Sequence, residues 1–393
     1  MSQADLQALL RSAPLVDGHN DLLWALRELR EKGEPEPDVA GPAPELQTDL
    51  PRLAEGCVGG QFWSVYVPSD LAGHEAVTAT LEQIDALHRL VSRYPDRLAH
   101  ARTADDVERI AASGRVASMI GVEGGHSIGD SLGALRMFAA LGAGYLTLTH
   151  NDDTAWADSA TGDHPHGGLT RFGEEVVREL NRCGVLVDLS HVSDDTMRQA
   201  IEVSEAPVVF SHSSARALCD VSRDVPDDVL AHVARTRGVV MVAFVPSFLT
   251  AEGARANAEA WAQARRLRIQ HADDPAALHA AMEAWWADVP EVDASVEDVA
   301  DHVDHVREVA GIDHVGVGSD FDGAAGMPAG LEDVSRYPAL FTVLKDRGYT
   351  DEDLRKVAGG NVLRVMREAE AVAARAQAER PPSTATIARE GDG

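Results

Sequence analysis

The chain contains few cysteines, few lysines and no long apolar run. Three cysteines among 393 residues, Cys57, Cys183 and Cys219, form an odd, sparse set that excludes a disulfide framework and favours a reducing compartment. The first residues lack the basic start and apolar core of a signal peptide. No apolar stretch approaches the length of a membrane span. We therefore expect a cytoplasmic protein that does not bind membranes.

Positive charge is also scarce. The chain has 35 Lys and Arg residues against 64 Asp and Glu residues, which gives a formal net charge of −29. A nucleic-acid-binding protein needs a basic surface, and none is visible in this sequence. The same balance disfavours binding to an anionic membrane. The remaining partners to consider are small molecules and other proteins.

Short apolar runs alternate with segments of helical periodicity along most of the chain. This alternation favours parallel strands joined by helical crossovers. Eight such units predict an α/β fold of the (β/α)8 TIM barrel type. The predicted strands are residues 14–19, 61–67, 116–122, 144–149, 184–190, 207–211, 238–245 and 314–319. The predicted helices are residues 79–92, 104–112, 131–141, 171–182, 193–203, 226–236 and 296–310.

The domain organisation follows from the same pattern. Residues 1–369 are expected to form a single barrel domain, since barrels of this kind routinely use this much chain. Residues 30–50, rich in proline and acidic groups, read as a surface loop. Helical spacing in residues 250–292 predicts an α-hairpin inserted after the seventh strand, either an ordinary surface excursion or a lid or subunit contact. Residues 370–393 are expected to be a disordered tail.

Several predicted strands end in residues that bind metals. His19 and Asp21 end the first strand two positions apart, so both side chains point the same way and can bind one ion. His191 and His212 end the fifth and sixth strands, and imidazole suits Zn²⁺. A single histidine at a strand end is more often a packed core residue. Together with a carboxylate at a further strand end, these histidines favour a metal-dependent hydrolase.

Glu123 ends the third strand after the apolar run Met119–Val122. A carboxylate in that position needs a positive partner, either an arginine or a pair of cations that it bridges. Many barrel hydrolases bridge two metals with a carbamylated lysine instead. This chain has lysine only at positions 32, 345 and 356, none of which ends a predicted strand. Glu123 is therefore the candidate bridge, and the lack of a strand-end lysine argues against a Schiff-base enzyme.

Three further residues are candidates for contacts with a substrate. Asp320 directly ends the eighth strand and could carry a proton from water to a leaving amine; Asp322, in the following glycine-rich turn, is its rival. His150 ends the fourth strand and could polarise a substrate carbonyl, or it could cap the turn that follows. Arg223 follows the His212 strand and could bind a carboxylate with both arms of its guanidinium, although alone it would be an ordinary surface arginine.

These motifs, in this order and spacing, resemble the membrane (renal) dipeptidase family from about residue 12 to residue 366. The segments that carry the resemblance are Asp17-Gly18-His19-Asn20-Asp21, Gly121-Val122-Glu123-Gly124-Gly125-His126-Ser127, Leu148-Thr149-His150-Asn151, Asp188-Leu189-Ser190-His191, Ser211-His212-Ser213-Ser214-Ala215 and Asp320-Phe321-Asp322-Gly323.

The resemblance implies a binuclear zinc hydrolase on a (β/α)8 barrel of the amidohydrolase-like group. Two Zn²⁺ ions would be bridged by Glu123 and a water or hydroxide, one bound by His19 and Asp21, the other by His191 and His212. His150 would contact the scissile carbonyl, Arg223 the terminal carboxylate, and Asp320 would shuttle the proton. The expected substrates are dipeptides, including those with a C-terminal D-residue, and a homodimer is expected by analogy with family members.

The sequence also departs from that family. The animal members are secreted, disulfide-bonded and lipid-anchored, and this chain carries no signal for those features. Phe248 stands where those members place a substrate-facing tyrosine after the seventh strand. The insertion at 250–292 exceeds the animal pattern. Two other functions stay open. One is another amidohydrolase-type activity, the hydrolysis of lactones or cyclic amides or a deamination; the other is a non-catalytic barrel that binds metal or peptide.

Overall fold

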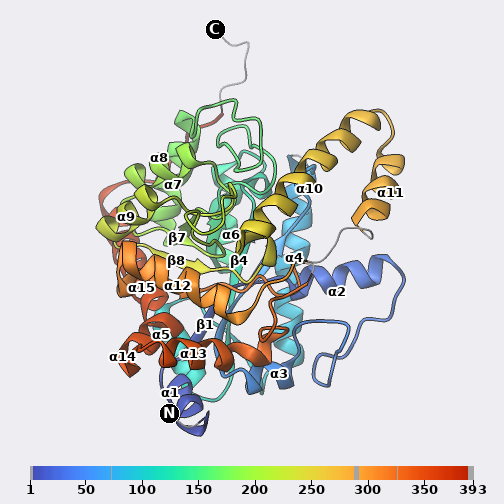
Figure 1. The fold of residues 1–393 in the computed structure, drawn as a ribbon. Coiled ribbons are helices and arrows are strands. Elements are labelled where there is room, and N and C mark those ends of the chain that lie inside the picture. The colour runs from blue at the N-terminus through green and yellow to red at the C-terminus, as the bar shows by residue number, and fades with distance from the viewer. Residues whose placement is uncertain (1–2, 72, 287–291, 325, 388–393) are drawn as a thin grey trace.

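The strands of the computed structural model form a closed parallel barrel surrounded by helices (Figure 1). The structure describes residues 3–71, 73–286, 292–324 and 326–387. Eight strands follow one another around the barrel in chain order, and the pairing of β2 with β4 belongs to this closed ring. They are β1 (Leu15–Asn20), β2 (Val58–Tyr66), β4 (Val116–Glu123), β5 (Ala143–Thr147), β6 (Leu186–Asp188), β7 (Val209–Phe210), β8 (Val239–Val242) and β9 (Val315–Val317). The predicted barrel is thereby confirmed.

One short strand, β3 (Leu98–His100), was not predicted. It pairs with the first residues of β4, on the side opposite β2, and stands outside the ring of eight. Strands β6, β7 and β9 are shorter than predicted, because the chain leaves the sheet before the residues that carry the chemistry. Both differences concern the ends of the barrel rather than its order.

The helices cover the outside of the barrel, and the seven predicted helices correspond to α4–α9 and α12. Side-chain caps begin several of them, as when Thr103, Thr170 and Ser193 accept a main-chain N–H three residues on. Within the described residues, no helix is both long enough and apolar enough to cross a bilayer. The helices are α1 (Gln3–Ser12), α2 (Leu22–Glu31), α3 (Leu50–Glu55), α4 (His74–Arg93), α5 (Ala104–Ala112), α6 (Leu132–Leu141), α7 (Arg171–Cys183), α8 (Asp194–Val203), α9 (Asp227–Thr236), α10 (Ala251–Gln270), α11 (Pro275–Trp286), α12 (Val296–Ala310), α13 (Tyr337–Asp346), α14 (Asp351–Arg355) and α15 (Asn361–Glu379).

Two buried apolar clusters stabilise this arrangement. The larger one packs strands against the surrounding helices. The smaller one joins Val16, Phe62, Met119 and Met241, which come from four different strands, with Leu363 of α15. Side chains from strands on different sides of a closed sheet can meet only in its interior, so this cluster fills the barrel.

The segment after β8 contains helices α10 and α11, which lie within the predicted insertion. Figure 1 shows them as a hairpin that extends from the body of the barrel. Residues 287–291 of the predicted insertion lie outside the described residues. The side chain of Arg268 on α10 lies 3.4 Å from Asp152, two residues after His150, so the hairpin contacts the rim of the barrel.

The expected disordered tail from residue 370 is wrong for residues 370–379, which are helical, whereas residues 380–387 form neither helix nor strand. Helix α15 runs to Glu379 because Val372 and Ala376 are buried against the body. The segment after α15 is held by polar contacts, including Arg380 to Glu205 at 2.5 Å and Ser383 Oγ, which donates to Glu175 at 2.8 Å. Residues 388–393 of the predicted tail lie outside the described residues.

The loop between α2 and α3 is also more buried than a surface loop. Val39 and Leu46 lie in the apolar core. Thr48 Oγ1 accepts a hydrogen bond from Asn20 Nδ2 at 2.8 Å. Arg52, at the start of α3, donates to the carbonyl of Leu46 at 2.7 Å. The loop thus supports the carboxyl end of β1.

Candidate metal centre

The carboxyl ends of the parallel strands bring the predicted site residues to one edge of the barrel. His19 is the second-to-last residue of β1, and Asp21 precedes the first residue of α2. Glu123 is the last residue of β4. The remaining members follow their strands by two or three residues: His150 after β5, His191 after β6, His212 after β7 and Asp320 after β9. This edge is where barrel enzymes place their active sites.

Glu123 lies at the centre of the cluster, and its two carboxylate oxygens face different partners. Oε2 lies 3.3 Å from Nε2 of His19 and accepts a hydrogen bond from Ser64 Oγ at 2.9 Å. Oε1 lies 3.1 Å from Nε2 of His191 and 3.5 Å from Nε2 of His212. The carboxylate therefore stands between two groups of ligand-type side chains.

The first group is built around His19. Its Nε2 lies 3.1 Å from Asp21 Oδ2 and 3.9 Å from Asp320 Oδ1, yet this buried atom has no hydrogen-bond partner. Its Nδ1 lies 2.8 Å from the hydroxyl of Tyr145 on β5, which fixes the ring orientation. Gly323 packs against the same group, since a Cβ added there would lie 2.2 Å from Asp21 Oδ2.

The second group is built around His191 and His212. Their Nε2 atoms are 2.9 Å apart and both face Glu123. His212 Nδ1 lies 2.8 Å from Ser211 Oγ. Burial lowers the pKa of both histidines well below its ordinary value. Both rings are therefore neutral near pH 7, the form in which imidazole offers a lone pair to a cation.

The charges of the first group indicate that a cation belongs there. Burial alone would lower the pKa of His19, but Tyr145, Glu123 and Asp21 outweigh it and raise that pKa well above its usual value. Excess negative charge around a buried ring is the environment that a bound cation would balance. The nitrogen and carboxylate donors match the ligands preferred by Zn²⁺.

Three overlapping sets of side chains place their ligand atoms within 4.8 Å of one another. Glu123 belongs to two of the sets, as a bridging carboxylate would. These sets also place His212 with His19 and His150 with His191, although the Nε2 atoms of His191 and His212 lie 2.9 Å apart, as the pairing expected from sequence implies. The sets are His19 with Glu123 and His212; Glu123 with His150 and His191; and His19 with Asp21 and Asp320.

Asp320 and Asp322 have different surroundings. Burial raises the pKa of Asp320 to about 7, against the opposing effect of nearby His19. Asp322 instead forms a reciprocal pair with Gln47: its Oδ1 accepts the Gln47 N–H at 2.7 Å, and its own N–H donates to Gln47 Oε1 at 2.6 Å. Asp320 therefore faces the cluster, whereas Asp322 fastens the turn to the loop after α2.

His150 and Arg223 lie beside the cluster. His150 Nε2 is 3.7 Å from Glu123 Oε1, its ring packs against Tyr66 at 4.9 Å between centroids, and burial lowers its pKa to about 4. Arg223 is 3% exposed and donates to the carbonyl of His212 at 3.3 Å, with its guanidinium 5.3 Å above the ring of Phe248. Within the described part of the chain, Arg223 forms no ion pair, so its charge is open to a carboxylate.

Sequence reasoning missed the groups that orient the ligands. Tyr145 and Thr147 stand two positions apart on β5, so their side chains lie on the same face of the strand. Tyr145 contacts His19, and Thr147 contacts Asp188. That polar alternation within an apolar strand is the signal that could have identified them. Ser64 on β2 and Gln47 in the preceding loop carry no comparable signal.

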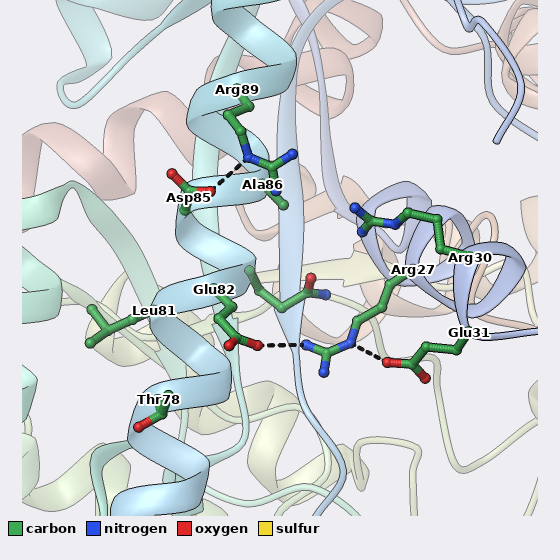
Figure 2. A pocket seen from close by; sticks show the side chains of 10 residues that line it. Arg27, Arg30, Glu31, Thr78, Leu81, Glu82, Asp85, Ala86 and Arg89 are labelled. Atoms are coloured by element: carbon green, nitrogen blue, oxygen red, sulfur yellow. Dashed lines mark hydrogen bonds and ion pairs between the residues drawn. The ribbon is translucent and has the colours of Figure 1, made fainter.

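A separate groove of about 570 Å³ lies between α2 and α4 (Figure 2). Most of its charged side chains pair with one another: Arg27 contacts Glu31 at 2.7 Å and Glu82 at 3.6 Å, and Arg89 contacts Asp85 at 2.6 Å. None of the residues that line it belongs to the histidine and carboxylate cluster. The groove is therefore a paired, solvated surface rather than part of the metal centre.

A closed parallel α/β barrel with this cluster at its carboxyl edge defines a barrel hydrolase that uses metal ions. Residues 3–380 match the model of the membrane dipeptidase family, peptidase family M19. The chain belongs to that family, and it is a metallodipeptidase, a hydrolase that acts on dipeptides.

Individual relatives agree with this assignment. Dipeptidase 3 of Mus musculus is 40% identical over 379 residues, covering 95% of this chain and 68% of the mouse protein. The structure of the probable dipeptidase PvdM from Pseudomonas aeruginosa has a TM-score of 0.80 at 25% identity, covering 94% of this chain and 98% of that one. A metallo peptidase from Rhodobacter sphaeroides, liganded with a phosphinate mimic of the dipeptide L-Ala-D-Ala, has a TM-score of 0.73 at 28% identity, covering 91% and 99%.

Proposed function

We propose that this dipeptidase hydrolyses its substrates with two zinc ions, one bound by His19 and Asp21 and the other by His191 and His212. Glu123 lies between these two pairs of side chains and would contribute to both sites. The observation that carries the proposal is the division of the Glu123 oxygens, Oε2 toward His19 and Oε1 toward the other two histidines. Bound zinc acts as a Lewis acid and lowers the pKa of water toward neutrality.

The surrounding side chains of the chain carry the proton and bind the substrate. Asp320 accepts the proton of the attacking water at Oδ1 and delivers it to the leaving amine, a role suited to a carboxyl whose pKa is raised to about 7. His150 is neutral and can donate a hydrogen bond to the developing oxyanion from its ring without losing its proton. Together they supply acid–base and electrostatic assistance at the scissile bond.

Arg223 selects substrates with a free C-terminal carboxylate. A buried guanidinium without an ionic partner gains strongly from a two-pronged contact with a carboxylate. Phe248 offers a ring face to the guanidinium and no hydroxyl, so the carboxylate would be bound by Arg223 without help from that position. This requirement restricts the substrates to short peptides that end at the site.

The substrates are proposed to include dipeptides with a C-terminal D-residue. The Rhodobacter sphaeroides neighbour binds a phosphinate mimic of L-Ala-D-Ala, and the present chain shares its fold at 28% identity. A cytoplasmic location and a homodimer stay predictions from the sequence.

One experiment tests these points together. Purified protein is assayed for zinc content and then against a dipeptide library with L- and D-residues at the C-terminal position, with lactones and cyclic imides included. We expect about two zinc ions per chain, turnover of dipeptides only, and loss of turnover after chelation. One metal per chain, preference for a lactone or cyclic imide, or binding of dipeptides without cleavage would contradict the proposal.

A further inference from the structure

Asp188, on β6, is a fully buried carboxylate that receives four hydrogen bonds. The main-chain N–H of Ser211 donates to it at 2.8 Å and that of Ser190 at 3.2 Å. The hydroxyls of Ser211 and Thr147 donate at 2.7 and 2.5 Å. Two carboxylate oxygens accept about four hydrogen bonds, so the acceptor capacity of Asp188 is filled by neighbours on β5, just after β6 and just after β7.

This arrangement determines how Ser211 can interact with His212. The hydroxyl of Ser211 has a single proton, and its strongest acceptor is the Asp188 carboxylate. The oxygen of Ser211 is then left as an acceptor for His212 Nδ1, 2.8 Å away. With the proton on Nδ1, the Nε2 of His212 presents its lone pair to the metal centre. The distance of 2.9 Å between the Nε2 atoms of His191 and His212 agrees with this tautomer, because one of the two nitrogens must be a hydrogen-bond acceptor.

Asp188 also fixes the backbone next to His191, the other histidine of the second group. His191 has φ of +67°, a left-handed conformation that is unfavourable for a residue with a side chain. Such a residue persists only where its surroundings fix it. The N–H of Ser190, the residue before it, is tied to Asp188. One carboxylate therefore lies behind both histidines of the second group.

We propose that Asp188 is a positioning residue for the second metal: through Ser211 it fixes the tautomer of His212, and through Ser190 it holds the turn that presents His191. The proposal rests on the assignment of both histidines as metal ligands. It adds the chain Asp188, Ser211, His212 as the element that keeps the Nε2 lone pair available.

The chain contains a matched control for this role. Asp17 on β1 is equally buried and clasps Ser319 in the same way, with the Ser319 N–H at 2.7 Å and its hydroxyl at 2.8 Å. The residue after Ser319 is Asp320, so no histidine continues that chain. Asp17→Asn thus reproduces the change to a buried carboxylate without altering the partner of His212 Nδ1.

The test is Asp188→Asn, with Ser211→Ala as a milder change of the same chain. An asparagine amide donates to Ser211 Oγ, which frees the Ser211 hydroxyl to donate to His212 Nδ1 and moves the ring proton to Nε2. The His212 tautomer is read from ¹⁵N chemical shifts of the metal-free protein. Zinc affinity is measured by competition with a chromophoric chelator, with His212→Ala as reference.

We expect both variants to shift His212 away from the Nδ1–H tautomer and to weaken zinc binding about 10- to 100-fold. Asp17→Asn should keep the wild-type tautomer. The inference is overturned if the His212 tautomer is unchanged both in Ser211→Ala and in folded Asp188→Asn. It is also overturned if the tautomer changes but zinc affinity does not, while His212→Ala does lose zinc. Unchanged affinity in His212→Ala itself would instead contradict the ligand assignment. If Asp188→Asn does not fold, Ser211→Ala decides by the same criteria.

Discussion

Replacement of Asp320 by asparagine separates proton transfer from metal binding. The side chain keeps its shape and one oxygen but can no longer take up a proton. Asp320 Oδ1 lies 3.9 Å from His19 Nε2, close enough to the ligand cluster that a role as a ligand has to be distinguished from a role as a base. A base that acts only on protons should leave the metal content of the variant unchanged.

The magnitude follows from general acid–base catalysis, which contributes about 10²- to 10⁴-fold to rates. At 1.36 kcal/mol for each factor of ten, kcat should fall by an amount equivalent to about 2.7–5.4 kcal/mol. Burial raises the pKa of Asp320 to about 7, and bound cations would lower it again. Because the base must be ionised, wild-type kcat/KM should rise with pH along a limb at or below pH 7, and this limb should disappear in the variant.

The assay is steady-state hydrolysis of a dipeptide from pH 5 to 9, with zinc content measured on the same samples. Asp322→Asn is the control, since Asp322 lies two residues away and is also buried, with φ of +64°. The amide oxygen of the Asp322→Asn variant can still accept the hydrogen bond from the Gln47 N–H, so the kcat of this variant should stay within about tenfold of wild type. An Asp320→Asn enzyme with full zinc and turnover within about threefold of wild type would refute the proton-transfer role.

Three other substitutions test separate parts of the site and fold. Arg223→Lys keeps the charge but loses the two-pronged donor, so kcat/KM for dipeptides should fall about tenfold or more while that for the matched dipeptide amide changes less; equal losses would exclude a carboxylate contact. Gly323→Ala places a Cβ 2.2 Å from Asp21 Oδ2 and 2.7 Å from Asp320 Oδ1, so zinc content should fall and the protein should lose about 1–3 kcal/mol of stability; full zinc by elemental analysis would show that the turn can shift. Burial lowers the pKa of His100 from its ordinary 6.5, so the unfolded chain binds the proton more readily and stability falls as pH drops below that value. His100→Gln should flatten this decline in urea unfolding at pH 7.5 and 5.5, and parallel declines would contradict the reasoning.

The sequence predicted the order of the barrel because its elements differ in period and length. Helices α5 and α12 were predicted to the residue, since an acceptable cap precedes an amphipathic run in each. Strand β3 was missed because three residues carry too little alternation to separate them from a loop. The end of α15 was missed because its buried face beyond residue 370 consists mostly of alanine, which has little hydrophobic contrast with its polar neighbours.

The candidate ligands were predictable because each stands at or just after the end of a predicted strand. The structure brings the seven histidine and carboxylate candidates to one edge, with Arg223 beside them. Distances between them were not predictable: the ring of His212 packs against His19 at 3.8 Å between centroids, in addition to its contact with His191. The orienting contacts of Tyr145 and Ser64 depend on register between strands, and one sequence does not specify register.

Two of the strands that were predicted too long, β6 and β9, are followed by a residue with a strained backbone. His191 and Asp320 both have left-handed φ, +67° and +69°, and such a residue costs on the order of 1–3 kcal/mol. In each case the preceding serine donates its N–H to a buried carboxylate, Asp188 or Asp17. The turn ends the strand and directs the side chain of His191 or Asp320 toward the ligand cluster, which a regular strand end would not do. The apolar runs continue up to these turns, so the sequence predicts strand along their whole length. The observed strands are shorter because the contacts that form the turns also end the strands.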